Sequence, residues 1–298
     1  MTPYKDACRA WFGFTLLIAL LSWSAWARFF LLFHACGLLD EEQLHAYSVT
    51  AGSLCVRVML LANPQIKRKL DYDYTKFENE AKGCVVIANH ASYIDMFLVL
   101  SAFPARVLLK RKVRPVAAAA LVEHIPVIGK TFEYSGAFKV YFQAKGSGFG
   151  KAACEDDFSV DKTRQQEEVD KMDAHLRKGL VIGVFPEGKM NGTPEEIASF
   201  RRGTFAQAIK HAVPIYAITF SGATDCWPRK AKIGGLPCTI QGRLDKLATP
   251  DGTETAPDAA ARLAEECRGA MQKTLNAMRP AVKPSRAISD AYPVTGGD

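Results

Sequence analysis

Two long apolar stretches open the chain. Residues 11–27 carry no charged side chain, and after Arg28 the apolar run continues to residue 39. A second apolar stretch covers residues 49–63, beyond an acidic turn at residues 40–42. As an α-helix the first stretch would extend about 26 Å, slightly less than a hydrocarbon core of about 30 Å. We therefore expect two helices that form a hairpin in or on a bilayer.

Two other interpretations of these stretches stay open. Lys5 and Arg9 precede the first run, which ends in Ala-Trp-Ala at residues 25–27, as in a cleavable signal peptide. Because neither run is without charge over a full span, two buried core helices would also fit. The basic residues before the first run and the acidic turn after it favour a cytosolic N-terminus.

Beyond residue 66 the pattern changes to short apolar runs that alternate with longer amphipathic segments, which is typical of an α/β domain. We expect this domain over residues 67–280, after membrane-associated helices in residues 1–66 and before a disordered tail at residues 281–298. The pattern predicts a flexible loop at residues 145–150. Predicted strands lie at residues 84–88, 106–110, 180–185 and 214–220. Predicted helices follow Asp95 and lie at residues 117–124 and 205–212 and in the charged stretch 155–178.

The composition narrows the choice of partner. The 298 residues include 38 Lys and Arg against 31 Asp and Glu, a formal charge of +7, which indicates an anionic partner. Nucleic acid is disfavoured because the chain begins with membrane-directed sequence and shows no recognition motif. The eight cysteines include no CxxC pair and no Cys/His cluster at zinc spacing, so we expect no metal site and a reducing compartment.

The segment VVIANHASYIDMFLVL, residues 85–100, sets His90 and Asp95 between two apolar runs. In one continuous helix, residues five apart point about 140° away from each other, so these side chains would not meet. Ser92 is a good N-cap and Asp95 follows at the capping-box position, which predicts a helix that begins at Tyr93. His90 then lies in the preceding loop and folds back onto the first turn.

This arrangement makes His90 a candidate general base. A carboxylate bonded to one imidazole nitrogen leaves the other nitrogen to take a proton from an alcohol. The alternative is that Asp95 only caps the helix and that His90 is a polar loop residue.

A second group of candidates follows the predicted strand at residues 180–185. The sequence FPEG puts one carboxylate in a turn at a strand end, where sites in open α/β sheets lie. Two arginines follow after a short insert and would contact phosphate or pair with this carboxylate. A solvated loop is the alternative. The candidate acceptor-binding residues are Glu187, Gly188, Arg201 and Arg202.

Together these pieces resemble the membrane glycerolipid acyltransferases, whose best-known members are the 1-acylglycerol-3-phosphate acyltransferases. The resemblance covers roughly residues 80–220 and consists of four blocks in the family's order: NHxSxxD at 89–95, IPVIG at 125–129, FPEG at 185–188 and VPIYAI at 213–218. It implies an α/β fold with a mixed central sheet flanked by helices. The residues that would support the motifs are Asn89, Ser92, Phe185, Pro186 and Pro214.

The resemblance implies acyl transfer from acyl-CoA, as a co-substrate, to a hydroxyl of a lysophospholipid. The preferred acceptor would be 1-acylglycerol 3-phosphate, giving phosphatidic acid. His90 would be the general base, Asp95 would orient it, and neither a cofactor nor a metal would be required. The implied partners are acyl-CoA, the lysophospholipid and the bilayer. The implied location is the endoplasmic reticulum or another internal membrane, with the α/β domain facing the cytosol.

Two departures from the family pattern leave the acceptor open. Phe142 stands where the second block usually ends in arginine, and FPEG continues as Lys-Met-Asn instead of Thr-Arg-Ser. Another cation would have to bind the phosphate, since its charge matters more than its position along a loop. Otherwise the acceptor is a different lysophospholipid. The candidate cations are Lys139, Lys145, Lys189, Arg201 and Arg202.

Other functions remain possible from the sequence. A membrane-tethered lipid-binding protein without activity and a hydrolase that uses water are both compatible with the same fold. A basic cluster with no intervening acid would face either the phosphates of CoA or anionic headgroups, or would be a solvated face. It consists of Arg106, Lys110, Arg111, Lys112 and Arg114.

Overall fold

The computed structural model describes residues 3–144, 158–253, 256 and 258–279. The predicted flexible loop at 145–150 and the predicted tail at 281–298 lie outside the described residues.

A seven-stranded sheet lies at the centre of the described chain, in the order β1-β9-β8-β2-β7-β3-β4. Neighbouring strands are parallel except β8 and β9, so the sheet is mixed, as predicted. A separate antiparallel pair joins β5 (Phe142–Ala144) to β6 (Phe158–Val160). The strands of the sheet are β1 (Ile66–Asp71), β2 (Cys84–Ala88), β3 (Arg114–Ala118), β4 (Phe138–Val140), β7 (Val181–Val184), β8 (Ile215–Ser221) and β9 (Cys238–Ala248).

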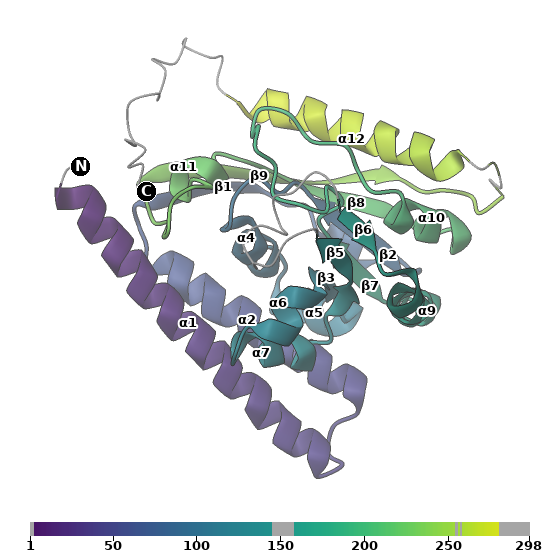
Figure 1. The fold of residues 1–298 in the computed structure, drawn as a ribbon, viewed down its shortest axis with the longest axis horizontal. Coiled ribbons are helices and arrows are strands. Elements are labelled where there is room, and N and C mark those ends of the chain that lie inside the picture. The colour runs from purple at the N-terminus through teal and green to yellow at the C-terminus, as the bar shows by residue number, and fades with distance from the viewer. Residues whose placement is uncertain (1–2, 145–157, 254–255, 257, 280–298) are drawn as a thin grey trace.

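Helices cover both faces of this sheet (Figure 1). On one face lie α9 (Lys162–Arg177), α10 (Gly203–Lys210) and α12 (Ala259–Met278). The N-terminal hairpin packs on the opposite face together with α4. The helices outside the first group are α1 (Pro3–Ala35), α2 (Glu41–Leu61), α3 (Thr75–Glu78), α4 (Asp95–Ala102), α5 (Ala105–Arg111), α6 (Ala119–His124), α7 (Ile128–Tyr134) and α11 (Ala223–Cys226).

Strand β2 shows how the sequence builds a core on each face. Cys84, Val86 and Ala88 point into the core beneath the hairpin, whereas Val85 and Ile87 point into the core beneath α10 and α12. Because side chains alternate along a strand, a strand covered on both faces must be continuously apolar. The sequence CVVIA satisfies this, and it fixes β2 in the middle of the sheet.

Most predicted elements of the α/β domain are confirmed, and one is wrong. The strands β2, β7 and β8 and the helix α10 lie within two residues of their predicted bounds. Residues 106–110, predicted as a strand, belong to helix α5, and the strand β3 follows it. A five-residue apolar run does not separate a strand from a buried helix. In α5 the buried residues Val107, Leu108 and Arg111 have helical spacing.

The hairpin of α1 and α2 shares a core with the α/β domain. Asp40 caps α2 in a capping box with Gln43, which starts the second helix directly after the turn. Phe12 of α1 and Val56 of α2 are buried in the same cluster as residues of β2 and β8. The hairpin is therefore packed onto the sheet, and β1 begins at Ile66, shortly after α2 ends.

The hairpin also exposes an apolar outer face. Both helices are long and apolar enough to cross a membrane, but the most apolar window is 28% buried in α1 and 61% buried in α2. The core-helix interpretation is therefore confirmed for most of the α2 window, whereas α1 is mainly exposed, and the bilayer and signal-peptide interpretations stay predictions. The outer face of the hairpin includes Trp11, Phe14, Leu17, Ile18, Leu21, Leu32, Leu54, Val58 and Leu61.

Candidate active site

Asn89 fixes the loop that follows β2. Its side-chain amide donates to the carbonyl oxygen of Phe220 at 3.0 Å and accepts from the Phe220 backbone N–H at 2.8 Å. Phe220 belongs to β8, the strand beside β2. These two hydrogen bonds extend the pairing of β2 with β8 by one residue beyond the end of β2. His90 is the next residue and therefore lies at the edge of the sheet where β2 ends.

His90 folds back onto the start of α4, as the sequence predicted. Its Nδ1 lies 3.3 Å from Oδ2 of Asp95. The side chain of Asp95 is 1% exposed and that of His90 is 21% exposed. The imidazole stacks on the ring of Phe185, with 4.3 Å between the centroids. The carboxylate is therefore buried beneath a histidine that reaches the surface.

The start of α4 differs in detail from the prediction. The helix begins at Asp95 instead of Tyr93, and no side chain caps it. The N-cap position is Ile94 and not Ser92. The hydroxyl of Ser92 donates to the carbonyl oxygen of Trp227 at 2.7 Å and accepts the backbone N–H of Ile94 at 3.4 Å. The acid half of the capping box is present, since Oδ2 of Asp95 accepts the backbone N–H groups of Ala91 and Ser92, each at 2.7 Å. These bonds hold the carboxylate toward His90.

Glu187 of the FPEG turn is bonded to the histidine loop. Its Oε1 accepts the backbone N–H of His90 at 2.7 Å, and its Oε2 accepts that of Ala198 at 3.1 Å. The residue is only 2% exposed. Burial raises the pKa of Glu187 to about 7, while the two backbone bonds act in the opposite direction. Both oxygens thus serve the protein's own backbone, and the acceptor contact expected of Glu187 stays a prediction.

The rest of the FPEG turn is held by backbone bonds. Gly188 has a φ of +72°, a conformation that favours glycine, and its N–H donates to the Phe185 carbonyl at 3.1 Å. The carbonyl of Pro186 accepts the N–H of Arg201 at 2.7 Å. Pro214 contributes its carbonyl to the N–H of Val85. The FPEG residues therefore shape the turn after the carboxyl end of β7, whereas Pro214 joins β8 to β2 at the opposite, amino ends of these strands.

Asn191 is a site residue that the motif comparison did not select. Its backbone N–H donates to the carbonyl of His90 at 2.6 Å, and its side-chain amide donates to the carbonyl of Glu196. With Glu187 on the N–H of His90, both backbone groups of the histidine are bonded to the loop after β7. The sequence gives no signal for this, because the partners are about a hundred residues apart.

The candidate phosphate-binding cations lie in different surroundings. Lys139 pairs with Glu123, with 3.5 Å between nitrogen and oxygen. Arg201 and Arg202 are exposed before α10. Lys189 is half-buried and lies in the sequence between Glu187 and Asn191, the two residues that bond to the backbone of His90. Lys145 lies outside the described residues.

The basic cluster at 106–114 does not form one anion-binding face. Four of its five residues bond to other described residues of the protein. Arg106 pairs with Glu78, Lys112 pairs with Glu42, and Arg111 is buried and donates to the carbonyls of Glu80 and Lys82. Arg114 donates to the carbonyl of Gly136 and lies over the ring of Phe138.

The ionisation of Glu187 provides a test of its position. Because its folded-state pKa lies above the ordinary value of 4.5, the folded protein keeps an extra proton between about pH 4.5 and about pH 7. This carboxyl alone should lower the free energy of unfolding by up to about 3 kcal/mol as the pH rises through the window. The buried His45 and His175, whose pKa values are lowered by burial to about 3 and about 4, act in the opposite direction. The measurement is therefore the difference in free energy of unfolding between the wild-type protein and Glu187→Gln, from denaturant titrations at several pH values, and we expect this difference to change across the window.

Glu196→Gln is the matched control, since Glu196 is exposed in the same loop. This variant should keep the slope of the wild-type protein. An unchanged slope in Glu187→Gln would show that the carboxyl titrates in water and that the loop is open.

Comparisons with known proteins agree with the fold and identify the family. The Acyltransferase family matches residues 70–221, just over half of the 298 residues, and the chain belongs to this family. The chain is similar to the 1-acyl-sn-glycerol-3-phosphate acyltransferase of Saccharomyces cerevisiae, with 26% identity over 246 residues, which cover 80% of this chain and 69% of that protein. The resemblance to the glycerolipid acyltransferases is thereby confirmed, and the protein is an acyltransferase.

Two further proteins extend the comparison. The chain is 24% identical over 197 residues to the human 1-acyl-sn-glycerol-3-phosphate acyltransferase beta, which covers 65% of this chain and 60% of that protein. The crystal structure of the 1-acyl-sn-glycerophosphate (LPA) acyltransferase PlsC from Thermotoga maritima has a TM-score of 0.66 at 15% identity, over 93% of this chain and 98% of that one. This likeness confirms the predicted fold class.

Proposed function

We propose that the protein transfers an acyl group from acyl-CoA to the hydroxyl of 1-acylglycerol 3-phosphate and forms phosphatidic acid. The observation that carries the proposal is the His90–Asp95 pair, with Nδ1 and Oδ2 3.3 Å apart and the imidazole at the surface. The names of the yeast and human relatives support this choice of acceptor.

In the proposed mechanism His90 is the general base. Its Nδ1–H donates to Asp95, so Nε2 carries the lone pair that takes the proton from the acceptor hydroxyl. The acceptor oxygen attacks the thioester carbon, and the tetrahedral intermediate collapses as the carbon–sulfur bond breaks. The proton on Nε2 then passes to the leaving thiolate of CoA. The carboxylate of Asp95 stabilises the imidazolium between these two steps.

Lys189 is our candidate partner for the phosphate of the acceptor. It directly follows Gly188, and the loop to which it belongs holds the backbone of His90 through Asn191. An acceptor anchored at this lysine would have its hydroxyl near the imidazole. Lysine binds phosphate as a point charge, so its place in the loop tolerates the departure from the family's arginine.

The outer face of the hairpin would place the site at the membrane surface. Its side chains are aromatic and aliphatic over successive turns of α1, which suits a helix lying in the boundary between headgroups and acyl chains. A lysophospholipid reaches the site from the bilayer and acyl-CoA reaches it from water. We propose that this membrane is internal, such as the endoplasmic reticulum, with the α/β domain on the cytosolic side.

The direct test is release of CoA thiol from oleoyl-CoA by the purified protein, with a panel of acceptors. We expect 1-acylglycerol 3-phosphate to react at least about tenfold faster than lysophospholipids with larger headgroups, because a lost charged contact costs roughly 1.5–3 kcal/mol. The lipid product should be phosphatidic acid.

Each other outcome would point to a specific alternative. A faster reaction with another lysophospholipid would replace the proposed acceptor. Release of fatty acid without an acceptor would indicate a hydrolase. No reaction from a protein that still binds lipid would favour the inactive lipid-binding alternative.

A further inference from the structure

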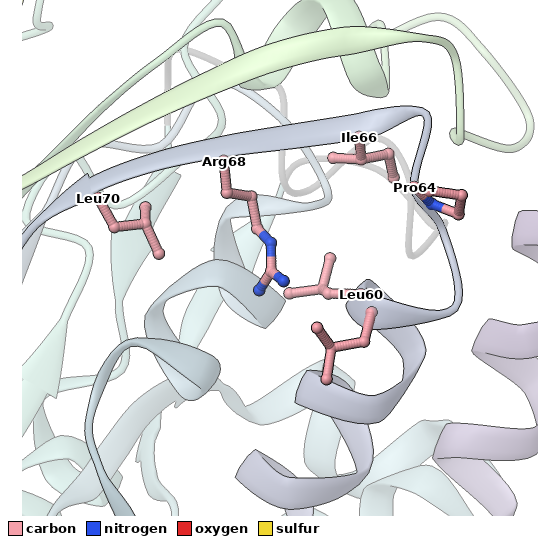
Figure 2. A pocket seen from close by; sticks show the side chains of 6 residues that line it. Leu60, Pro64, Ile66, Arg68 and Leu70 are labelled. Atoms are coloured by element: carbon pink, nitrogen blue, oxygen red, sulfur yellow. The ribbon is translucent and has the colours of Figure 1, made fainter.

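A groove runs between the end of α2 and the edge strand β1 (Figure 2). Its volume is about 460 Å³, within the range of small-molecule sites. None of the residues that line it belongs to the four motif blocks, so the groove is separate from the candidate active site. Its lining residues are Leu60, Leu61, Pro64, Ile66, Arg68 and Leu70.

Arg68 brings a positive charge into this apolar groove. Side chains alternate along β1, so Arg68 points toward α2 with Ile66 and Leu70, as Figure 2 shows, while Lys67 and Lys69 point to the opposite side. Burial lowers the pKa of Arg68, and the charge of Arg57 lowers it further. The guanidinium is therefore partly removed from water and close to a second one.

Neither arginine has an acidic partner among the residues that the structure describes. Arg57 donates from Nη2 to the carbonyl of Phe103 at 2.7 Å, while its buried Nε has no hydrogen-bond partner. For Arg68 the described residues offer no hydrogen bond or ion pair. Two neighbouring cations without a counter-ion are unfavourable in a partly desolvated groove. A bound anion would relieve both the repulsion and the missing bonds.

The surroundings indicate that this anion is a lipid. Leu54, Val58 and Leu61 form a stripe along α2 that is 50–71% exposed, and the groove begins where this stripe ends. The exposed Leu70 continues the apolar surface on β1. The positive charge of Arg68 therefore lies directly beside an exposed apolar surface. A phospholipid has the matching arrangement, with a negatively charged phosphate next to its acyl chains.

We propose that the groove between α2 and β1 binds an anionic phospholipid of the membrane, with its phosphate on Arg68 and an acyl chain along Leu61 and Leu70. This site would be independent of the acceptor site and of the reaction. It would hold the edge of the sheet at the level of the headgroups while the outer face of the hairpin contacts the acyl chains.

The test measures binding of fluorescent phosphatidylglycerol to the full-length protein in neutral detergent micelles. This lipid is neither the proposed acceptor nor the proposed product. We expect Arg68→Gln to weaken binding about tenfold or more, since a charge-assisted bond is lost. Arg68→Lys keeps the charge but loses the planar fork, and we expect a severalfold loss. Lys67→Gln, on the opposite side of the same strand, should change affinity less than about twofold.

If the overall positive charge of the protein, and not the groove, determined the affinity for lipid, the variants would rank differently. In that case Arg68→Lys would equal the wild-type protein and Arg68→Gln would equal Lys67→Gln, which would overturn the proposal. Displacement of the lipid by an equal concentration of inorganic phosphate would also overturn it, because the groove would then take a soluble anion. Without lipid, Arg68→Gln should unfold at the wild-type temperature or slightly above it, since it removes the repulsion by Arg57 and no described bond.

Discussion

Replacing His90 with alanine is expected to lower kcat for acyl transfer by roughly 10²- to 10⁴-fold, the usual contribution of a general base. The substitution removes the imidazole that is 3.3 Å from Asp95 and stacked on Phe185. It leaves the backbone bonds to Glu187 and Asn191 in place. We therefore expect KM for the acceptor to change little. The measurement is release of CoA thiol at saturating substrates.

His124→Ala is the matched control, because His124 is an exposed histidine at the end of α6. This variant should keep the wild-type rate. A wild-type rate in His90→Ala would mean that another group takes the proton, and the proposed mechanism would then be rejected.

Asp95→Asn is expected to lower kcat by a comparable factor, roughly 10²- to 10⁴-fold. The side chain keeps its shape, and its amide oxygen can still accept the N–H groups of Ala91 and Ser92. The amide nitrogen then takes the place of Oδ1, which is buried without a hydrogen-bond partner among the described residues. The substitution thus removes mainly the negative charge that would stabilise the imidazolium.

Thermal unfolding separates this effect from a loss of structure. We expect the Tm of Asp95→Asn to stay close to that of the wild-type protein, whereas Asp95→Ala also loses the backbone bonds and should melt earlier. If Asp95→Asn transfers acyl groups at the wild-type rate, the carboxylate only holds the start of α4, which is the alternative that the sequence left open.

Local patterns were enough to predict the central strands and the histidine–aspartate pair. The strand at 84–88 is continuously apolar because it is buried on both faces. His90 returns to Asp95 because the carboxylate accepts the backbone N–H groups of Ala91 and Ser92 in the turn between them. The segment 106–110 was misassigned because five apolar residues suit a helix or a strand equally well. This segment forms the helix α5 because helical spacing lets it pack on the domain and buries Arg111, which donates to the carbonyls of Glu80 and Lys82.

The long-range bonds of the site were not predictable from one sequence. The contact of Glu187 with His90 joins residues 97 apart, and that of Ser92 with Trp227 joins residues 135 apart. In the sequence, the carboxylate of FPEG looks like a ligand for substrate. In the structure both carboxylate oxygens of Glu187 accept backbone N–H groups, those of His90 and Ala198. Glu187 therefore holds the loop that carries His90.

Trp227 connects the N-terminal hairpin to the loop that carries His90. Its carbonyl receives the hydroxyl of Ser92, and its ring meets the buried ring of Phe12 of α1 edge-on, with 5.6 Å between the centroids. We therefore expect removal of the hairpin to expose the ring of Trp227 and to loosen the loop that carries His90. Measurements on the candidate site should use the protein with its N-terminal hairpin in place.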